Sequence, residues 1–410
     1  EVARIIREVR PDMQVELGHR CGGQLNFPRR IVNTVLTAAT KHRYGEFVQA
    51  VEQALSSRRI QAEVMILKAD GGTLPLSESL DTPVETIFSG PAASVLGALS
   101  LTEAGQTGVV VDIGGTTTDL ALILSGQPLM AAKGVAIKGQ LTQVRSFAIN
   151  ALPLGGDSRV VVEAGRLVIK PERQGPAACL GGPSPTPTDA LRLLNRVELG
   201  SYELAAAALK PLADQLGVTL LEVAEQILMA AARIVEDGIN AMYQAWQQEP
   251  AYHIWKLVQK RSQAIDTIIG VGGGAAGLIQ PVADALGCRL VLSELGAVAN
   301  AVGAAVAQPT VRISLRADTE QGKYQLEEDG VQRAIPGHTS ISQAEVVQIG
   351  EQCLQERAQK LGLDPLPEKS EQIYHEVFNV VRGSRTVGAI HYLVLETPWR
   401  ISHYVGGEQA

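Results

Sequence analysis

The chain has 410 residues, of which 45% are hydrophobic and 19% are charged, and its net charge is −7 at pH 7. This length allows roughly two or three domains, and the acidic balance disfavours a nucleic-acid-binding surface. No apolar run approaches the ~20 residues of a membrane span, and the four cysteines are scattered without the C-x-x-C spacing of a zinc site. We therefore expect a cytoplasmic protein that binds neither nucleic acid nor membrane.

The first 30 residues predict a helix, a short strand and a polar loop. Residues 1–9 have helical spacing, Pro11 ends that helix, and Val15–Leu17 has the composition of a short strand. Arg20 lies in the polar loop Gly18–Arg30 and is a candidate substrate ligand, because arginine forks suit carboxylates and phosphates. A solvated loop leading into a helix is the alternative interpretation.

A long helix, a buried strand and a helix of small residues are expected next. Ile31–Ser57 has apolar residues at helical spacing and predicts one long or two abutting helices. Val64–Gly72 indicates a strand running into a turn, where Asp70 faces a ligand or simply forms the turn. The helix that starts near Ser89 is rich in small residues, so it can approach another backbone closely.

Two apolar runs flank the sequence D-I-G-G-T-T-T-D, which predicts two strands joined by a tight glycine turn within Gly108–Leu124. Backbone N–H groups and hydroxyls at such a turn can hold phosphate oxygens. Asp112 and Asp119 are the candidate catalytic carboxylates, because a magnesium ion prefers carboxylate and phosphate oxygens. The candidate phosphate ligands are Gly114, Gly115, Thr116, Thr117 and Thr118. A surface hairpin that merely requires glycine is the alternative.

A second glycine turn lies in Pro153–Ser158. Asp157, Gly156 and Ser158 either deliver polar groups to the same site or belong to a hairpin turn without a function. The first of these residues is a third candidate catalytic carboxylate, and the other two are candidate substrate ligands.

A loop and a helical region follow. Gly175–Asp189 is rich in glycine and proline and predicts an ordered loop, with Thr188 or Asp189 capping the next helix. The alanine-rich segment Tyr202–Trp246 predicts helices.

A strand, three glycines, a helix and a strand then follow one another. The predicted strands are Thr267–Val271 and Arg289–Leu292, and the predicted helix between them is Ala275–Leu286. Glycines at a strand-to-helix junction let the backbone lie against a flat or anionic ligand, and the start of the helix adds partial positive charge. The candidate nucleotide ligands are Gly272, Gly273 and Gly274. A further helix of small residues is expected over Ala297–Ala307.

The same glycines permit a different interpretation. Gly272, Gly274 and Gly277 satisfy G-x-G-x-x-G, and Glu294 lies about 20 residues further on, as in dinucleotide-binding folds. Taken alone, this block would indicate an NAD-binding oxidoreductase. The hairpin about 160 residues upstream has no role in that scheme. We expect instead that the two glycine turns meet and hold opposite ends of one triphosphate nucleotide.

Taken together, these motifs carry a family resemblance. The order DIGGTTTD, VGGG and ANAVGAA is similar to the actin, sugar kinase and heat-shock chaperone ATPase superfamily. FSGPAASVLGAL before VVVDIGGTTTDLALI, with PAACLGGPSPTPTDA downstream, resembles the hydantoinase A and oxoprolinase family over about residues 1–310. The resemblance implies an α/β, two-lobed, actin-like ATPase (ribonuclease H-like) fold that clamps ATP.

The resemblance also implies an activity, which is ATP-dependent opening of a cyclic amide such as a hydantoin or 5-oxoproline. On this scheme ATP phosphorylates the amide oxygen and water then cleaves the ring. Asp112 would hold Mg²⁺, Gly114–Thr117 would bind the terminal phosphates, and Gly272–Gly274 would lie against the adenosine. A second hydantoinase-type subunit, or a second copy of the chain, is the expected protein partner. A non-catalytic ATPase of the same fold that remodels or reactivates a partner enzyme is the alternative.

The sequence departs from the family pattern at two places, and it predicts three domains. The family has an earlier D-x-G-G-T-x-T-D near its N-terminus, whose absence predicts a fragment or processed form lacking the phosphate hairpin of the first lobe. The family also has a run of glycines where this chain has Gly155–Ser158, which leaves the ring substrate open. The expected domains are residues 1–105, the remainder of the first lobe; 106–310, the second lobe with a helical insertion; and 311–410, a small α+β region.

Within that last region, strands are expected at Val311–Leu315, Ile390–Leu395 and Trp399–Val405, and a helix at Gln343–Leu361. Its histidines, His375, His391 and His403, lack metal-ligand spacing, so packing or surface positions are expected.

Overall fold

The computed structural model describes residues 2–405 except 22–25, 104, 132–133, 138, 249–263, 329, 336–340 and 364–368. The chain forms two compact units. Unit 1 comprises Glu1–Ser89, Ala131–Ser146 and Ala307–Arg400, and unit 2 comprises Gly90–Met130, Phe147–Val306 and Ile401–Ala410. The domain boundaries expected from the sequence divide the chain at other points, and they stay a prediction.

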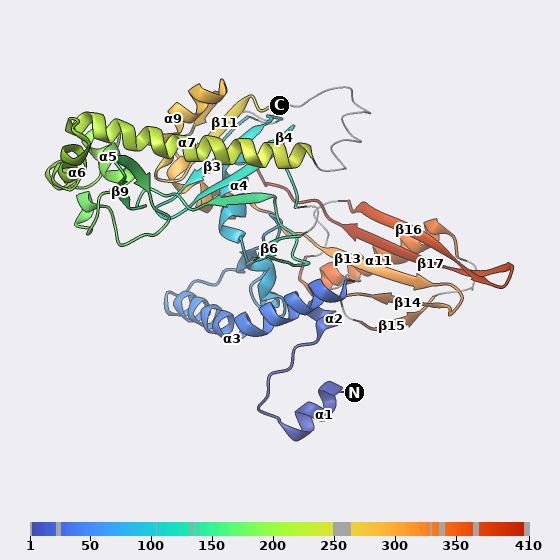
Figure 1. Cartoon of the computed structure of the whole chain (residues 1–410). Helices are drawn as coiled ribbons and strands as arrows, with labels where there is room; N and C mark the ends of the chain where they lie inside the picture. Colours follow the sequence, from blue (N-terminus) through green and yellow to red (C-terminus); the bar gives the residue numbers. More distant parts are fainter. Residues whose placement is uncertain are drawn as a thin grey trace. The chain divides into compact units, whose positions relative to one another are not determined.

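Unit 2 is built on a mixed sheet (Figure 1). Its elements in chain order are α4 (Ser89–Ser100, which begins at the last residue of unit 1), β3 (Gly108–Ile113), β4 (Thr118–Leu124), β5 (Gln127–Pro128), β8 (Ile149–Leu152), β9 (Val160–Glu163), β10 (Arg166–Ile169), a 3-10 turn (Ala178–Leu180), α5 (Pro187–Leu193), α6 (Tyr202–Leu216), α7 (Leu220–Gln247), β11 (Thr267–Val271), α9 (Ala275–Leu286), β12 (Arg289–Leu292), a 3-10 turn (Gly296–Val298) and α10 (Ala299–Val306).

The sheet has the order β12-β11-β3-β4-β5, with β8 also paired to β4. β12, β11 and β3 are parallel, and β4 turns back antiparallel to β3. The β-branched run of β3 is buried on both faces, which suits a central strand. The strand, glycine turn and strand predicted around D-I-G-G-T-T-T-D are therefore confirmed, as are the predicted bounds of β11, α9 and β12.

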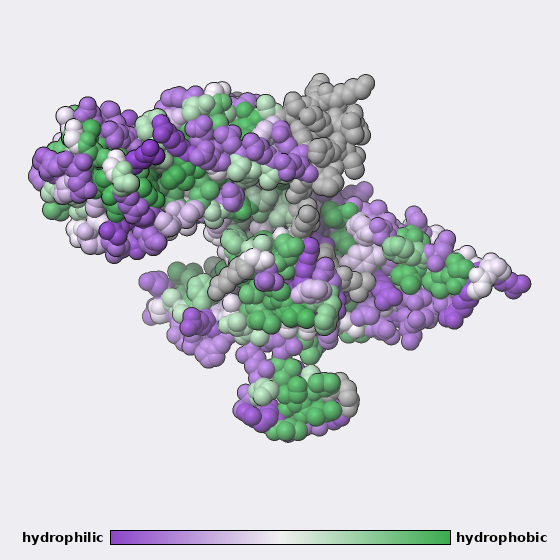
Figure 2. Space-filling view, viewed as in Figure 1, coloured by the Kyte–Doolittle hydropathy of each residue, from purple (hydrophilic) through white to green (hydrophobic). Residues whose placement is uncertain are grey.

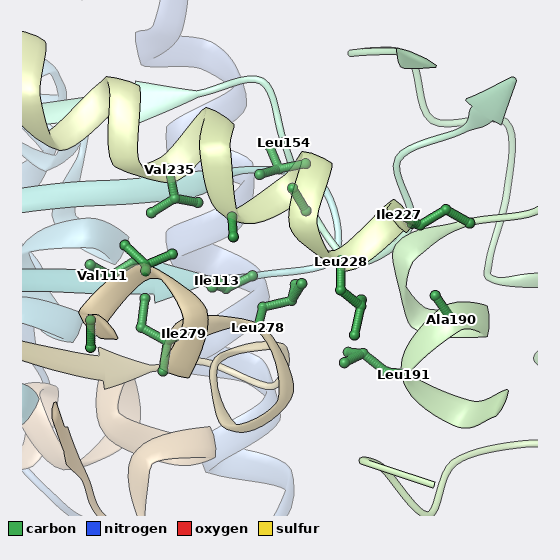
Figure 3. Packing of buried hydrophobic residues seen from close by; sticks show 14 of the residues in the cluster. Val111, Ile113, Leu154, Ala190, Leu191, Ile227, Leu228, Val235, Leu278 and Ile279 are labelled. Atoms are coloured by element: carbon green, nitrogen blue, oxygen red, sulfur yellow. The ribbon is translucent and has the colours of Figure 1, made fainter. Parts of the chain in front are cut away.

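Helices cover one face of this sheet (Figure 1). Alternation along β3 directs Val111 and Ile113 into a core shared with α5, α7 and α9, and Figure 3 shows them packed against Leu278 and Ile279 of α9 and close to Leu228 of α7. Full burial of one such side chain contributes about 1.5–3 kcal/mol. Asp112, between the two core residues, consequently points to the opposite face of the sheet.

Small residues let two helices of unit 2 cross closely, as the sequence predicted. A Cβ at Gly97 of α4 would lie 1.8 Å from the carbonyl oxygen of Ala299, at the start of α10. A Cβ at Gly303 of α10 would lie 1.8 Å from the carbonyl oxygen of Ala93 in α4. Glycine is therefore required at both positions, because any side chain would collide with backbone.

Unit 1 combines helices with an antiparallel sheet. Its elements in chain order are α1 (Val2–Val9), α2 (Gly18–Cys21), α3 (Phe27–Ser57), β1 (Met65–Leu67), β2 (Thr73–Pro75), two 3-10 turns (Glu78–Leu80 and Pro83–Thr86), β6 (Ala136–Ile137), β7 (Gln140–Leu141), β13 (Arg312–Asp318), β14 (Lys323–Leu326), β15 (Gln332–Ala334), α11 (Gln343–Lys360), β16 (Glu371–Arg382) and β17 (Arg385–Glu396).

The sheet of unit 1 has the order β15-β14-β13-β17-β16, and α11 packs on one of its faces. Gly350 of α11 sits where a Cβ would be 2.7 Å from Leu393 Cδ2, so the helix lies close against β17. Asn26 caps α3, which is one continuous helix. The apolar stripe of α1, made of Val2, Ile5 and Val9, is exposed and forms part of a green patch in Figure 2.

Two predicted strands are wrong. Val15–Leu17 has no strand partner in the described residues, and the Leu17 carbonyl instead accepts the N–H groups that open α2. Trp399–Val405 also forms no strand. Ile401 makes a single β-bridge, and the backbone N–H groups of Ser402 and Val405 donate to the last carbonyls of α10 and α4, which satisfies the ends of these helices.

Candidate functional site

Three glycine-rich turns of unit 2 lie against one another, and we call them the first corner (Gly114–Thr117), the second corner (Gly155–Ser158) and the third corner (Gly272–Gly274). The first corner joins β3 to β4, the second follows β8, and the third joins β11 to α9. Segments about 160 residues apart in the chain are thus brought to one end of one sheet.

The first corner is a tight turn closed by the Gly114 N–H, which donates to the Thr117 carbonyl oxygen at 3.0 Å. Its tip, Gly115 to Thr117, is exposed. The hydroxyl of Thr118 is not part of that exposed surface. It is buried and donates to the Leu154 carbonyl oxygen at 2.8 Å, which corrects its expected role as a phosphate ligand.

The second corner docks on the first through its backbone. Gly156 N–H donates to the Gly114 carbonyl oxygen at 2.9 Å, and Asp157 N–H donates to the Gly115 carbonyl oxygen at 2.8 Å. A Cβ at Gly155 would lie 2.4 Å from the Gly115 carbonyl carbon. Glycine is therefore needed at residue 155 for the two turns to touch.

Buried polar groups hold the second corner from behind. The Gly156 carbonyl oxygen accepts from both the N–H and the hydroxyl of Thr188, at 2.9 and 2.8 Å. Ser158 is 1% exposed, and its Oγ accepts from the Gly155 N–H at 2.8 Å. The hydroxyl of Ser158 thus stabilises the turn itself, while a substrate role for Gly156 or Ser158 stays a prediction.

The loop before α5 is fixed by a buried carboxylate. Thr186, rather than Thr188 or Asp189, is the N-cap of α5, and Asp189 completes a capping box with it. The Asp189 carboxylate also accepts the backbone N–H groups of Ala178 and Cys179 at 3.1 and 2.6 Å. Burial and the neighbouring Asp189 raise the pKa of the Cys179 thiol to about 12, which disfavours the thiolate form.

The third corner lies directly beside the first because β11 pairs in parallel with β3, with Val271 opposite Asp112. Gly274 N–H donates to the Ile113 carbonyl oxygen at 3.0 Å. Gly272 has φ +85°, and a Cβ there would lie 2.3 Å from Asp112 Oδ1. No atom lies within 4 Å of a Cβ built on Gly273, which is exposed.

Two carboxylates stand beside these corners. Asp112 and Asp119 are register partners in the β3–β4 ladder, so their side chains share one face of the sheet. Burial, and then the charge of Asp112, raises the pKa of Asp119 to about 6. A divalent cation between the carboxylates would relieve this repulsion.

The donors present fit a magnesium ion with phosphate. No group of three or more His, Cys, Asp or Glu side chains in the described ranges could hold a metal. Mg²⁺ is commonly bound by one or two carboxylates, with phosphate oxygens and water completing its ligands. The exposed tip of the first corner, next to Asp112 and Asp119, is where such phosphates would be held.

Most of the predicted site residues belong to unit 2, and one belongs to unit 1. Asp112, Asp119, Asp157 and the glycines of all three corners are in unit 2. Arg20 is in α2 of unit 1 and is exposed, and its substrate role stays a prediction.

Sequence reasoning missed Arg173, whose Nη2 lies 2.8 Å from Asp157 Oδ2. It also missed the role of Thr188 behind the second corner. Arg173 lies in a loop and Thr188 in the first turn of α5, and neither position belongs to a periodic pattern that would have revealed its role. The sequence Thr186-Pro187, a capping residue followed by proline, could have located the start of α5.

The fold of the chain is similar to that of solved ATP-dependent enzymes. The α/β, actin-like ATPase fold expected from the sequence is confirmed by likeness to solved structures. Acetone carboxylase in its nucleotide-free structure matches with a TM-score of 0.70 and 14% identity, over 99% of this chain and 62% of that one. The ATP-dependent caprolactamase of Pseudomonas jessenii matches with a TM-score of 0.62 and 18% identity, over 96% of this chain and 61% of that one. At these identities the likeness concerns the fold alone.

The family follows from the sequence comparison. The family model described as Hydantoinase/oxoprolinase matches residues 30–313, and the chain belongs to this family. Caprolactamase subunit alpha of Pseudomonas jessenii is 24% identical over an alignment of 306 residues, and the match covers 70% of this chain and 42% of that protein. An uncharacterized protein of Methanocaldococcus jannaschii is 24% identical over an alignment of 256 residues, and the match covers 55% of this chain and 37% of that protein. The chain thus spans less than half the length of these two curated relatives.

None of the helices in the described part of the chain is both long enough and apolar enough to cross a bilayer.

Proposed function

We propose that this chain binds Mg²⁺ and ATP at the three corners and is the ATP-using part of an enzyme that opens a cyclic amide of the hydantoin or 5-oxoproline type. Membership of the Hydantoinase/oxoprolinase family supports this proposal, as does the similarity to a caprolactamase subunit. The observation that carries it is the meeting of the third corner with Asp112, beside the exposed tip of the first corner.

Each corner has a separate role in the proposal. Gly114, Gly115, Thr116 and Thr117 hold the terminal phosphates, and Gly272, Gly273 and Gly274 lie against the adenosine end. Asp112 holds the magnesium ion, directly or through water, with Asp119 opposite it. The ion supplies charge neutralisation for phosphate oxygens when it is bound.

The proposed chemistry is phosphoryl transfer followed by ring opening. The amide oxygen attacks the γ-phosphorus of ATP, the bond to the β–γ bridging oxygen breaks, and ADP leaves. Water then adds to the activated carbon and the C–N bond of the ring breaks, so that the ring nitrogen leaves as N–H and an acyl phosphate remains. A second water hydrolyses the acyl phosphate to a carboxylate and free phosphate. Positioning and electrostatic stabilisation supply most of the rate in such transfers, which suits a site made mainly of backbone groups and carboxylates. Asp157 of the second corner is the candidate for moving a proton on the substrate side.

A dinucleotide-binding function is less well supported. Dinucleotide folds place the pyrophosphate at the glycine turn of a parallel βαβ unit. Here the carboxylate of Asp112 lies against that turn, and β3 is followed by an antiparallel hairpin. A carboxylate beside a pyrophosphate without a bridging cation is repulsive.

The test is a panel of hydantoins, 5-oxoproline and lactams added to the chain with Mg²⁺ and ATP, with and without a candidate second subunit. ADP formation that depends on one ring compound supports the proposal. ADP formation that ignores every ring compound and responds only to a protein partner would support an ATPase that remodels that partner. Tight NADH binding without competition by ATP would support the oxidoreductase.

A single variant tests the metal role. Asp112→Asn should lower the affinity for ATP in the presence of Mg²⁺ without unfolding the chain. The matched control is Asp214→Asn, which removes a carboxylate from an exposed ion pair on α6. Equal loss in both variants, or no loss in Asp112→Asn, would contradict the role of Asp112.

A further inference from the structure

A cationic side chain stands beside the three corners without a role in the proposal above. Arg173 lies in the loop after β10, and its Nη2 donates to Asp157 Oδ2 at 2.8 Å. Its Nε donates to the Gly175 carbonyl oxygen at 3.0 Å, which fixes the direction of the guanidinium. The Arg173 side chain is 46% exposed, whereas that of Asp157 is 15% exposed. The arginine therefore covers the carboxylate and keeps part of its own fork toward solvent.

The oxygen that Arg173 contacts is also the oxygen nearest the first corner. Asp157 Oδ2 would lie 3.0 Å from a Cβ on Gly115, and the Asp157 N–H is bonded to the Gly115 carbonyl oxygen. A single carboxylate oxygen thus separates the guanidinium from the exposed turn at Gly115. An oxyanion placed on this turn would therefore lie next to the carboxylate oxygen that already pairs with the guanidinium.

The local charge balance favours such a contact. Asp112, Asp119 and Asp157 place three carboxylates around the corners, and a triphosphate would add more negative charge. Among the ion pairs of the described residues, the pair between Arg173 and Asp157 is the one that brings a cation to this group. A guanidinium has five N–H donors in a planar fork, and this fork matches phosphate oxygens.

We infer that Arg173 contacts the terminal phosphate of the nucleotide at the first corner, and that Asp157 holds the guanidinium in place for this contact. The inference rests on the proposed function and adds a phosphate ligand that contributes a full positive charge. A simpler role for Arg173 would be to neutralise Asp157. The two roles predict different behaviour when both side chains are removed.

The experiment measures the Kd of Mg·ATP and Mg·ADP by calorimetry at one fixed salt concentration. The proteins are the wild type, Arg173→Gln, Arg173→Lys, Asp157→Asn and the Arg173→Gln/Asp157→Asn double variant. Loss of a charge-assisted contact to phosphate should weaken ATP binding about 10- to 100-fold in Arg173→Gln, with a smaller effect on ADP. The affinity of Arg173→Lys for ATP should lie between those of the wild type and Arg173→Gln, because lysine keeps the charge and loses the planar fork.

The double variant separates the two roles. If Arg173 contacts phosphate, the double variant still binds ATP more weakly than Asp157→Asn, but by a smaller factor than that between Arg173→Gln and the wild type, because the two side chains in contact are coupled. If the double variant binds ATP as the wild type does, Arg173 serves only to neutralise Asp157 and the inference is overturned. Urea unfolding of every variant excludes loss of structure as the cause.

The experiment also separates this inference from the proposed function. A wild type that binds ATP equally with and without Mg²⁺, or not at all, overturns the proposed function and the inference with it. A wild type that binds Mg·ATP, together with an Arg173→Gln variant of equal affinity for ATP, overturns the inference alone.

Discussion

Asp112 and Asp119 stand directly opposite each other across the β3–β4 ladder, with a buried ladder on one side of them and the exposed glycine turn on the other. Like charges at such positions destabilise an antiparallel pair. The raised pKa of Asp119, about 6, is the electrostatic consequence of burial and this pairing. A cation bound between the two carboxylates would remove this repulsion, and the relief would add to the free energy of binding the cation.

Proton competition at Asp119 should make Mg·ATP binding depend on pH. Because the pKa of Asp119 is about 6, protonation below that pH removes one of the two carboxylates from the cation. The affinity of the wild type should therefore fall as pH drops from 7 to 5, approaching about tenfold per pH unit below 6. Calorimetry measures the affinity of the wild type and of Asp119→Asn at each pH. Protonation of the nucleotide affects both proteins equally, so it cancels in the ratio of the two affinities. A ratio that stays constant across this range would contradict the metal role of Asp119.

The third corner offers a matched pair of glycine substitutions. Gly272→Ala should destabilise the chain by about 2–4 kcal/mol, because the residue has φ +85° and its Cβ would lie 2.3 Å from Asp112 Oδ1. Gly273→Ala meets no atom within 4 Å, so its cost should be about 0.5 kcal/mol or less. Urea unfolding measures both. Equal stability of the two variants would show that a side chain at residue 272 does not collide with Asp112.

Asp189 is expected to be the most sensitive carboxylate behind the second corner. It is fully buried and accepts N–H and O–H groups from Ala178, Cys179 and Thr186. Asp189→Asn replaces one acceptor by an NH₂ group that faces donors, which should cost about 2–4 kcal/mol of unfolding free energy.

Glu222→Gln is the control for Asp189→Asn, because Glu222 has the same capping-box position at the exposed start of α7. Glutamine serves in capping boxes, so this change should cost about 0.5 kcal/mol or less. Thermal melts compare the two. Similar losses in both variants would argue against a special role for the buried carboxylate.

Two neighbouring histidines in the sheet of unit 1 should contribute a loss of stability in mild acid. His391 is 2% exposed and its Nδ1 lies 3.3 Å from His375 Nε2, so burial, together with the proximity of His375, holds the pKa of His391 below 6.5. Burial also lowers the pKa of His375. At these two side chains the unfolded chain binds protons more readily than the folded chain, so their contribution to stability falls as pH drops through and below about 6.5.

The measurement for this pair is the urea midpoint between pH 5 and 8 for the wild type and His375→Gln. The variant should lose part of the acid-dependent fall, because one of the two depressed histidines is removed. His42→Gln, at an exposed position of α3, is the control and should keep the wild-type profile. An identical pH profile for all three proteins would refute the expectation.

The sequence was most informative where the signals are local. The bounds of β11, α9 and β12 followed from a strand, a glycine turn and helical spacing that adjoin in the chain. The same holds for the hairpin at Asp112, whose two apolar runs and glycines define a turn without reference to the rest of the protein. The meeting of the first and third corners was expected from chemistry, and parallel pairing of β3 with β11 provides it.

The features that could not be predicted from the sequence depend on contacts between residues that belong to no repeating sequence pattern. The pairing of Arg173 with Asp157 joins two loops, and neither residue belongs to a repeating pattern. β16 was missed because it is an edge strand that is exposed along most of its length, so its sequence lacks a regular buried face. The false strand at Val15–Leu17 shows the opposite case, since strand composition requires a partner that these residues lack among the described strands.

The parallel pairing of β3 with β11 also governs how the protein is made. About 160 residues separate Asp112 from Gly272, so a ribosome at 5–20 residues per second adds the partner strand roughly 10 to 30 s after β3 emerges. During that interval the apolar strand β3 has an open edge toward the position of β11, which is the kind of surface that aggregates or recruits chaperones. Nascent chains that stop before residue 272 should therefore be insoluble without such help, and nucleotide affinity should arise only once the third corner has been synthesised.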